Sequence, residues 1–439
     1  MSPTSTEGAA TVDPESTSTP VDAPSRPVPP AFELPDGCGD GVVVAGQYDC
    51  FVPTRLQGPD FSGYPQGDGH DVDGDGREEV VHVASTMRLL GFEDDDGFVL
   101  GPEAAPTGVP SDLEWRWDWD GDGENELTVL DVGPTATIKT ATPIGAAQLG
   151  PWTLVHDLAE PRGANEGKAV PIDVDGDGQL EVVVSRRLEP EWNTSPHEIT
   201  VRRRAGDAWE FSGPGFPFGG CGWLYRHAYG DVDGDGDEDL VIEDAGTGCD
   251  PHPSDYDPAW DRVGVFLVDH AVGELTLAGW FPTGARSNNT WLEVSDADGD
   301  GLPDIVMNLT GAAEVSAGFL RGRGDGTFEV GTRLSFEGSG GPGYLNIRAR
   351  VDLDGDGDRE WLGTGSAVAN TVAVFALESP MTALSLAALP TIEVPLEGWS
   401  HYTESTAVDF NGDGVDDPFV TTNLPGPGNL YRYVFLSAP

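Results

Sequence analysis

Basic residues are scarce in this chain. Only 23 of its 439 residues are Lys or Arg, against 76 Asp and Glu, and the formal net charge is −53. Nucleic acids and anionic membrane surfaces are bound through basic faces. The charge balance therefore argues against both as partners.

Long apolar runs are absent, and cysteines are few. No run of about 18 apolar residues occurs, so we expect no membrane span. The four cysteines, Cys38, Cys50, Cys221 and Cys249, lack metal-type spacing. They predict two disulfides and an oxidising compartment, with free buried thiols as the alternative. No signal-peptide apolar region follows Met1, which indicates either a removed signal or a cytosolic protein. The cysteines favour a secreted or surface-anchored protein.

Signatures of catalysis are also missing. The sequence has no nucleophile elbow, no glycine loop that would cradle phosphate and no His pair at zinc spacing. Its eight histidines are scattered along the chain. We therefore predict no catalytic residues and no catalytic activity.

Residues 1–36 have a distinct composition. They are rich in Ser, Thr and Pro and contain almost no large apolar residues to bury. Such a segment cannot form a core and favours extended conformations. We predict a disordered linker over 1–36 and one folded domain over 37–439.

An acidic motif repeats through that domain. The segment "DVDGDGREE" begins at Asp71, and six further copies begin at Asp118, Asp173, Asp231, Asp296, Asp352 and Asp409. The intervals run from 47 residues (Asp71 to Asp118) to 65 residues (Asp231 to Asp296). Each unit is long enough for about four strands of ~5 residues with their turns.

A β-branched, apolar run follows each copy, as in "EVVHVAS" and "LEVVVSR". These runs predict strands entered directly from the acidic loop. A radial array of four-stranded sheets closes such a repeat, so we predict an all-β fold, a seven-bladed β-propeller with four-stranded antiparallel blades. The last unit lacks one strand, and the segment "GVVVAGQYDCFVP" at 41–53 is expected to supply it and remove the open edge.

Crowded carboxylates repel one another, and the spacing within the motif indicates the cation that would offset this. Acids at positions 1, 3 and 5 share one loop, glycine at 6 allows a sharp turn, position 7 offers its carbonyl, and the acid at 9 can bind through both oxygens. Six or more oxygen ligands suit Ca²⁺ better than Mg²⁺. An EF-hand would need its last acid at position 12, where no copy has one. A metal-free Asp-Gly turn is the alternative for any single copy.

The predicted ligands, by motif positions 1, 3, 5, 7 and 9, form up to seven calcium sites. They are Asp71, Asp73, Asp75, Arg77, Glu79; Asp118, Asp120, Asp122, Glu124, Glu126; Asp173, Asp175, Asp177, Gln179, Glu181; Asp231, Asp233, Asp235, Asp237, Asp239; Asp296, Asp298, Asp300, Leu302, Asp304; Asp352, Asp354, Asp356, Asp358, Glu360; and Asp409, Asn411, Asp413, Val415, Asp417.

With these motifs the chain resembles the FG-GAP or VCBS repeats of integrin-alpha-like propellers, over residues 40–439. The resemblance implies a calcium-stabilised propeller in exported proteins, used mainly for adhesion or ligand binding, with the calcium loop between strands one and two of each blade. The seventh loop departs at Asn411, which keeps an oxygen but loses a charge. We expect that site to be the weakest.

Propeller topology separates two faces. The metal loops lie on one face, and the longest insertions lie on the other, where we predict a ligand platform of Trp192, His197, His252, Tyr256 and Trp260. The alternative is that these side chains only cap the blades. Cys221 and Cys249 fall on the same face, as a disulfide requires, and Cys38 and Cys50 would close a local bridge.

Two further patterns have structural interpretations. Trp115, Trp117 and Trp119 alternate along one strand, which favours packing between blades. Arg323, Gly324 and Asp325 spell an adhesion tripeptide, but "GDGTF" is typical of a hairpin between strands three and four. A turn is therefore the favoured interpretation there.

The sequence thus predicts an extracellular, calcium-stabilised binding or adhesion propeller whose ligand is an extracellular protein or glycan. The runner-up is a carbohydrate-active propeller, similar to a polysaccharide lyase, with Arg286, Arg348, Tyr344 and His227 as loose candidates for its cleft. A lectin with pockets between blades is the third hypothesis.

Overall fold

The computed structural model describes one body of the chain. The chain divides into Met1–Leu34 and Pro35–Pro439, and the described residues all lie in the second unit. They are 52–56, 64–72, 74–83, 87–93, 97–103, 110–131, 135–145, 148–161, 169–187, 197–205, 208–218, 223–245, 261–284, 286–310, 315–334, 345–352, 359–365, 371–377, 391–395, 403–423 and 430–436. The predicted linker at 1–36 lies outside them.

The first four blades follow one another along the chain. Blade one contains β2 (Tyr64–His70), β3 (Glu79–Val83), β4 (Met87–Glu93) and β5 (Gly97–Leu100); blade two contains β6 (Pro110–Trp117), β7 (Glu126–Asp131), β8 (Thr135–Ala141) and β11 (Thr153–Pro161), with the small hairpin β9 (Pro143–Gly145) and β10 (Gln148–Leu149) between its last two strands; blade three contains β12 (Ala169–Ile172), β13 (Glu181–Arg187), β14 (His197–Ala205) and β15 (Ala208–Phe218); and blade four contains β16 (Trp223–Gly230), β17 (Asp239–Ala245), β18 (Arg262–Asp269) and β19 (Glu274–Pro282).

The remaining strands complete the set. Blade five contains β20 (Arg286–Ser295), β21 (Asp304–Thr310), β22 (Val315–Gly322) and β23 (Phe328–Leu334); blade six contains β24 (Leu345–Val351), β25 (Glu360–Gly365), β26 (Thr371–Leu377) and β27 (Thr391–Pro395); and blade seven contains β28 (Thr403–Val408), β29 (Asp417–Asn423), β30 (Leu430–Leu436) and β1 (Val52–Leu56). Within the described ranges the strands thus form seven four-stranded antiparallel sheets and one two-stranded hairpin. The prediction of an all-β propeller with antiparallel four-stranded blades is confirmed.

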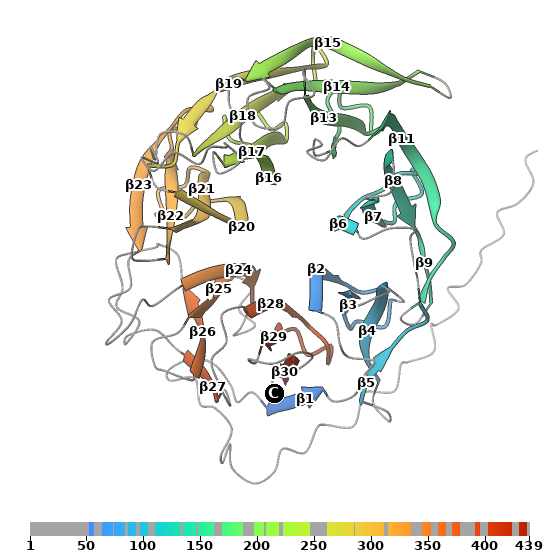
Figure 1. Cartoon of the computed structure of the whole chain (residues 1–439), viewed down its shortest axis with the longest axis vertical. Helices are drawn as coiled ribbons and strands as arrows, with labels where there is room; N and C mark the ends of the chain where they lie inside the picture. Colours follow the sequence, from blue (N-terminus) through green and yellow to red (C-terminus); the bar gives the residue numbers. More distant parts are fainter. Residues whose placement is uncertain are drawn as a thin grey trace, which may run out of the picture. The chain divides into compact units, whose positions relative to one another are not determined.

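The first strand of each blade is its innermost strand (Figure 1). Strand β2 contacts β6 on one side and β28 on the other, and β20 contacts both β16 and β24. Each metal motif connects this inner strand to the second strand of its own blade. The seven acidic loops therefore belong to one end of the array of inner strands.

The hydrophobic core lies between neighbouring blades. Ile172 and Val174 of blade three pack with Leu240 and Phe266 of blade four in one buried cluster. Similar clusters join blades one and two, two and three, four and five, and seven and one. Successive side chains of a strand point to opposite faces of its sheet. Because each face of a blade packs against a neighbouring blade, the strand needs apolar residues on both faces.

The tryptophans of "EWRWDWD" take part in this packing, as predicted. Trp115 belongs to the cluster between blades one and two, and its ring stacks on His70 at 5.0 Å between centroids. Trp119 packs against the cluster between blades two and three. Trp117 meets Tyr229 of blade four edge to face, at 5.2 Å.

A strand from the start of the domain completes blade seven. Strand β1 pairs antiparallel with β30, with Val52 opposite Leu436 and Leu56 opposite Arg432. It overlaps the predicted segment 41–53 only at Val52 and Pro53, so the outer strand lies a few residues later in the sequence. The alternation "VPTRL" places Leu56 in the buried cluster between blades seven and one.

The turn at the adhesion-like tripeptide is confirmed as a hairpin. It joins β22 to β23, and the amide of Arg323 donates to the carbonyl of Thr327 at 3.1 Å. The amide and hydroxyl of Thr327 both donate to the carboxylate of Asp325. These bonds use the Asp side chain to hold the turn.

Several predicted residues lie outside the described ranges: the four cysteines, Trp192, His252, Tyr256 and Trp260. His197 begins β14. Among the described residues, no helix has the length and apolar character needed to cross a membrane.

The closing strand gives a stability prediction. Leu56 is 7% exposed, so Leu56→Ala should lower the free energy of unfolding by about 2 kcal/mol, the lower end of the range for buried leucines. Val330, in the outer strand of blade five, is 50% exposed, so Val330→Ala should change it by about 0.5 kcal/mol at most. Urea unfolding of both variants measures the difference, and equal losses would contradict a packed closing strand.

Candidate metal centres

The acidic loops share one hydrogen-bonded frame, and position 1 is its hub. In blade four the carboxylate of Asp231 accepts the amide of Gly234 at 2.7 Å and that of Gly236 at 3.1 Å. The carboxylate at position 5, Asp235, accepts the amide of Asp237 at 2.9 Å. Two of these hydrogen bonds recur in the loops of blades one, two, three, five and seven. The amide at position 6 donates to the carboxylate at position 1, and the amide at position 7 donates to the carboxylate at position 5.

The acid at position 9 closes the loop from the second strand. Asp239 accepts the amide of Val232, at position 2, at 2.8 Å. The same bond recurs in six loops, with Glu79, Glu126, Glu181, Asp304 and Asp417 as the other acceptors. Position 9 is buried in all six. Its carboxylate is thus held inside the loop by the backbone.

Two glycines are required by the backbone in each of the six loops that the structure describes at these positions, those of blades one to five and seven. In blade two, Gly121 at position 4 and Gly123 at position 6 have φ of 79° and 93°, values that side chains other than glycine rarely adopt. The sequence argument assigned this role to position 6 and missed position 4, although the glycine there repeats equally. In blade three a Cβ on Gly176, at position 4, would also lie 2.9 Å from the His270 ring.

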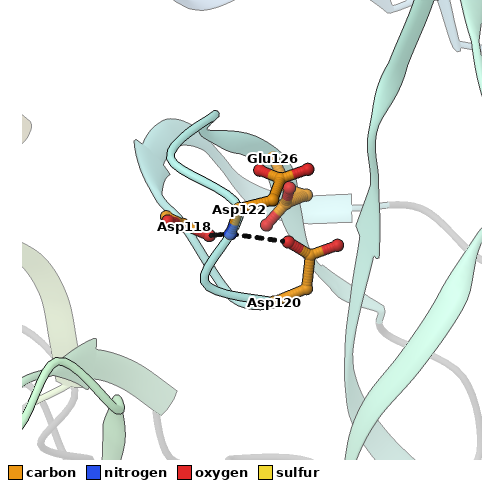
Figure 2. A group of neighbouring side chains, drawn as sticks. All are labelled: Asp118, Asp120, Asp122 and Glu126. Carbon is orange, nitrogen blue, oxygen red and sulfur yellow. Dashed lines mark hydrogen bonds between the residues drawn. The ribbon is translucent and has the colours of Figure 1, made fainter. Parts of the chain in front are cut away.

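The frame directs the remaining carboxylate oxygens toward one point. Figure 2 shows Asp118, Asp120, Asp122 and Glu126 converging in blade two, with one oxygen of each within 4.8 Å of the others. Positions 1, 3 and 9 converge in the same way in blades three and four, and positions 1, 3 and 5 in blade five. Calcium binds oxygens at about 2.3–2.6 Å, so oxygens this close can share one ion.

Three of these loops contain a buried carboxylate oxygen with no hydrogen-bond partner: Oε1 of Glu126, Oδ1 of Asp175 and Oδ1 of Asp298. A buried charged oxygen left without a partner is costly. A bound cation would satisfy it, and hard carboxylate oxygens are the donors that Ca²⁺ prefers. The residues present therefore fit a calcium ion in these three loops.

The electrostatics agree with that fit. Burial, together with the neighbouring aspartates, raises the pKa of Glu181 and of Asp239 to about 7. The same causes raise the pKa of Glu126 and of Asp304. Without a cation, the buried position-9 acids resist ionisation, because burial and the neighbouring aspartates outweigh the backbone amides and, in blade three, Arg203.

Not every predicted site is assembled among the described residues. Asp73 of blade one and Asp354, Asp356 and Asp358 of blade six lie outside them. In blade seven, the amide nitrogen of Asn411 donates to Asp413 at 3.0 Å. An internal donor thus occupies one carboxylate oxygen there, and the weaker affinity of this site remains a prediction. A role for the position-7 carbonyls remains a prediction.

Two loops contain an arginine that the sequence argument missed. Arg321, from the third strand of blade five, lies 2.9 Å from Asp298 and 2.7 Å from Asp300. Arg203, from the third strand of blade three, lies 3.5 Å from both Asp175 and Glu181. The register of the second and third strands explains both contacts. Motif position 10 on the second strand pairs with a residue of the third strand, and the arginine is the next residue along that third strand. The equivalent residue is Gly91 in blade one and Leu267 in blade four.

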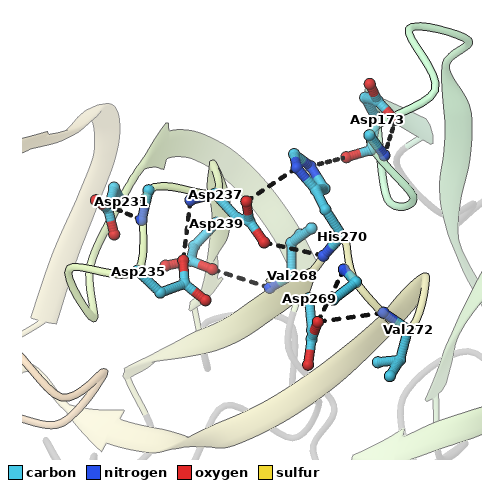
Figure 3. Close-up of polar contacts among 12 residues, drawn as sticks. Asp173, Asp231, Asp235, Asp237, Asp239, Val268, Asp269, His270 and Val272 are labelled. Carbon is cyan, nitrogen blue, oxygen red and sulfur yellow. Dashed lines mark hydrogen bonds and ion pairs between the residues drawn. The ribbon is translucent and has the colours of Figure 1, made fainter.

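Neighbouring loops are also linked to one another. His270 joins blades four and three: its Nδ1 lies 2.9 Å from Asp237 and its Nε2 lies 3.1 Å from the carbonyl of Asp173 (Figure 3). Between blades one and seven, the amide of Glu78 donates to the carbonyl of Asp409 at 2.8 Å. Asp416 makes the same bond to Asp352, between blades seven and six. The loops therefore contribute to contacts between blades.

The raised pKa values give a pH prediction. The folded pKa of Glu181 and Asp239, about 7, exceeds the ordinary value near ~4, so the metal-free fold binds more protons than the unfolded chain between about pH 4 and 7. The stability of the metal-free protein is therefore highest at the acidic end of this window and falls as the pH rises through it. Calcium binds the ionised form, so its stabilising effect should grow over the same window.

Thermal melts in EGTA and in about 10 mM Ca²⁺, at pH 5 and pH 8, measure this effect. At about ten times the dissociation constant, calcium adds about 1.4 kcal/mol per site, so Tm should rise clearly at pH 8 and much less at pH 5. Mg²⁺ at the same concentration is the control and should restore little stability. A melt at pH 8 that does not respond to calcium after verified metal removal would rule out the metal loops.

The arginine in blade five gives a second prediction. Arg321→Gln removes a cation from Asp298 and Asp300, so calcium should bind that loop a few-fold more tightly, the scale of a partly exposed ion pair. Arg323→Gln is the matched control, since Arg323 pairs with Glu329 in the neighbouring hairpin. Calorimetric titration with Ca²⁺ measures both. Equal changes in the two variants would mean that overall charge, rather than contact with the loop, sets the affinity.

Comparisons with known proteins give one family match. Residues 173–242, which run from the blade-three motif into β17, match a model described as an FG-GAP-like repeat. No curated protein matches the chain.

Among solved structures, BBS1N in complex with ARL6DN, soaked with lead, is 11% identical with a TM-score of 0.45, over 91% of this chain and 95% of that chain. A mutant of Synechocystis apocarotenoid oxygenase is 13% identical with a TM-score of 0.44, over 72% and 71%. These scores are too low to support an argument about function. The family match does bear on the acidic motifs: residues 173–242 resemble an FG-GAP-like repeat, and the resemblance inferred from the sequence is confirmed over that segment.

Proposed function

We propose that this chain is an extracellular, calcium-stabilised propeller of seven blades that binds a protein or glycan ligand without catalysis. The observation that carries the proposal is the repeated loop frame, in which backbone amides hold the carboxylates of positions 1, 5 and 9 and leave converging oxygens. Each copy of this loop frame brings carboxylates together that repel one another. Because the frame is nevertheless repeated, we expect the loops to stabilise the whole propeller once cations are bound.

In this proposal, positions 1, 3, 5 and 9 of each loop hold the calcium ion. The bound ion supplies positive charge that offsets the clustered carboxylates. The chain's own part is to position the ligands: the second strand presents the acid at position 9, and the amides of positions 4 and 6 orient the acid at position 1. A calcium-loaded loop would then fix the inner strand of its blade against the second strand.

An oxidising location is supported by the strand register around two of the cysteines. Trp223 pairs with Ala245 at one end of β16 and β17. Cys221 precedes Trp223 by two residues, and Cys249 follows Ala245 by four. A Cys221–Cys249 disulfide at this end is therefore compatible with the register, and we propose it together with Cys38–Cys50.

The proposed contact surface for a macromolecule is formed by the connections 188–196 and 246–260. They join the second strand to the third in blades three and four, at the end of the blades opposite the metal loops. They supply Trp192, Tyr256 and Trp260. Aromatic side chains on loops of a rigid scaffold are typical anchors for peptides and glycans.

A carbohydrate-active function is the second candidate, and one observation favours it. His227, one of the four loose sequence candidates, lies on the inner strand β16, with its Nε2 2.6 Å from a carboxylate oxygen of Glu114 on β6. A carboxylate–imidazole pair can move a proton. Arg286 begins β20, and Arg348 lies within β24.

The binding proposal is tested with the full chain in calcium, immobilised and exposed to a panel of extracellular matrix proteins and a glycan array. Replacing Trp192, Tyr256 and Trp260 together with Ala should weaken binding at least about tenfold, since three anchors are lost, and leave Tm in calcium nearly unchanged. The Val330→Ala variant is the surface control. Binding by the triple variant equal to that of the parent would show that the loops only cap the blades.

A further inference from the structure

A cavity of 490 Å³ lies among the inner strands. It is lined by the strands β2, β6, β16, β20 and β24, which belong to five different blades. Its side chains come mostly from the last few residues before each acidic motif, such as His70, Trp115 and Glu293. The cavity therefore lies toward the metal-loop end of the inner strands. Its size falls within the range of about 300–1,000 Å³ typical of small-molecule sites.

Two lining side chains contain a ring nitrogen that is buried and has no hydrogen-bond partner in the described structure: Nδ1 of His227 and Nε1 of Trp115. The His227 side chain is 7% exposed and its Nε2 faces Glu114. In the neutral ring Nε2 then carries the proton and Nδ1 is an acceptor, whereas the indole of Trp115 is a donor. Two residues that line the cavity thus contain one acceptor and one donor without a partner in the described structure.

Arg116, Glu293 and Arg350 are already paired with opposite charges, and Arg359, which also lines the cavity, is exposed to solvent. Arg116 pairs with Glu238 and lies 4.6 Å over the ring of Tyr229. Arg350 lies 3.6 Å from Glu293. An ionic ligand that binds Arg116, Glu293 or Arg350 would have to displace one of these partners. A neutral ligand rich in hydroxyl groups would not, because each hydroxyl can both donate to a carboxylate and accept from a guanidinium.

An aromatic surface completes the lining. Trp291 on β20 is partly exposed and lines the cavity beside Leu292 and Glu293. The face of an indole packs against apolar C–H groups and leaves polar groups to neighbouring side chains. One face of a pyranose ring presents such C–H groups, and its edge presents hydroxyls.

We propose that this cavity binds a neutral, hydroxyl-rich saccharide the size of a mono- or disaccharide. Trp291 packs on the sugar ring. The Glu114–His227 pair and the indole nitrogen of Trp115 bind its hydroxyls, and the Arg350–Glu293 pair binds a further hydroxyl. The site is separate from the loop surface proposed above and does not depend on it.

The test uses the full chain in calcium and saturation-transfer NMR with defined probes. The neutral probes are the methyl glycosides of glucose, galactose, mannose and N-acetylglucosamine, with lactose and cellobiose; the acidic probes are glucuronic and galacturonic acid. We expect at least one neutral probe to bind, and fluorescence titration of that probe gives its Kd. Failure of every neutral probe to bind, or binding of the acidic probes in preference, overturns the proposal.

Variants locate the site. Trp291→Ala and Glu114→Gln should each raise the Kd at least about tenfold, the effect of losing about 1.4 kcal/mol of contact. Val330→Ala, on the exposed outer strand of blade five, is the control and should retain the parent Kd. Melts in calcium establish that each variant is folded, and His227→Gln, with the same expected rise in Kd, replaces a cavity variant that does not fold. An unchanged Kd in the cavity variants, or a Kd raised equally in Val330→Ala, overturns the site.

Discussion

In every described metal loop the buried carboxylate at position 9 accepts a hydrogen bond from the amide at position 2, and the rest of the loop is arranged around that bond. It draws an acid from the second strand into the space between the carboxylates of positions 1 and 3, as Asp239 lies with Asp231 and Asp233. Like charges at this distance repel, and burial adds to the cost. The geometry that orders the loop therefore also gathers negative charge that a bound cation would offset.

The loops differ in how far their own side chains offset this negative charge. Blade two gathers four carboxylates and leaves Oε1 of Glu126 without a partner. In blade five the guanidinium of Arg321 already offsets part of the charge, and in blade seven the amide of Asn411 satisfies an oxygen of Asp413. A repeated motif thus gives sites that differ in charge. The ring thus combines loops whose carboxylates no side chain of the described residues neutralises with loops that the chain itself partly neutralises.

These local differences extend beyond single blades because the core lies between blades. A loop that orders the inner strand of one blade also orders the apolar face that the strand presents to its neighbour, as in the cluster of blades three and four. His270 and the backbone bond from Glu78 to Asp409 connect neighbouring loops directly. The same inner strands line the central cavity. The geometry of the acidic loops, blade packing and the shape of that cavity therefore depend on one set of strands.

The sequence by itself determined the features that depend on local spacing. Acids at positions 1, 3, 5 and 9 predict the oxygen cluster, and the β-branched runs predict the strand after each loop, because both rest on residues within one hairpin. The left-handed glycine at position 4 could also have been predicted, because it repeats in every copy of the motif.

Contacts between residues that are distant in the sequence could not be predicted in this way. His227 and Glu114 come from different blades and meet only because their inner strands face one cavity. Arg203 and Arg321 reach the loops through the register of the third strand, and β1 was displaced from its predicted segment because its pairing with β30 is set by the far end of the chain. Tertiary structure decided these features, since they depend on which strands become neighbours rather than on the residues adjacent in sequence.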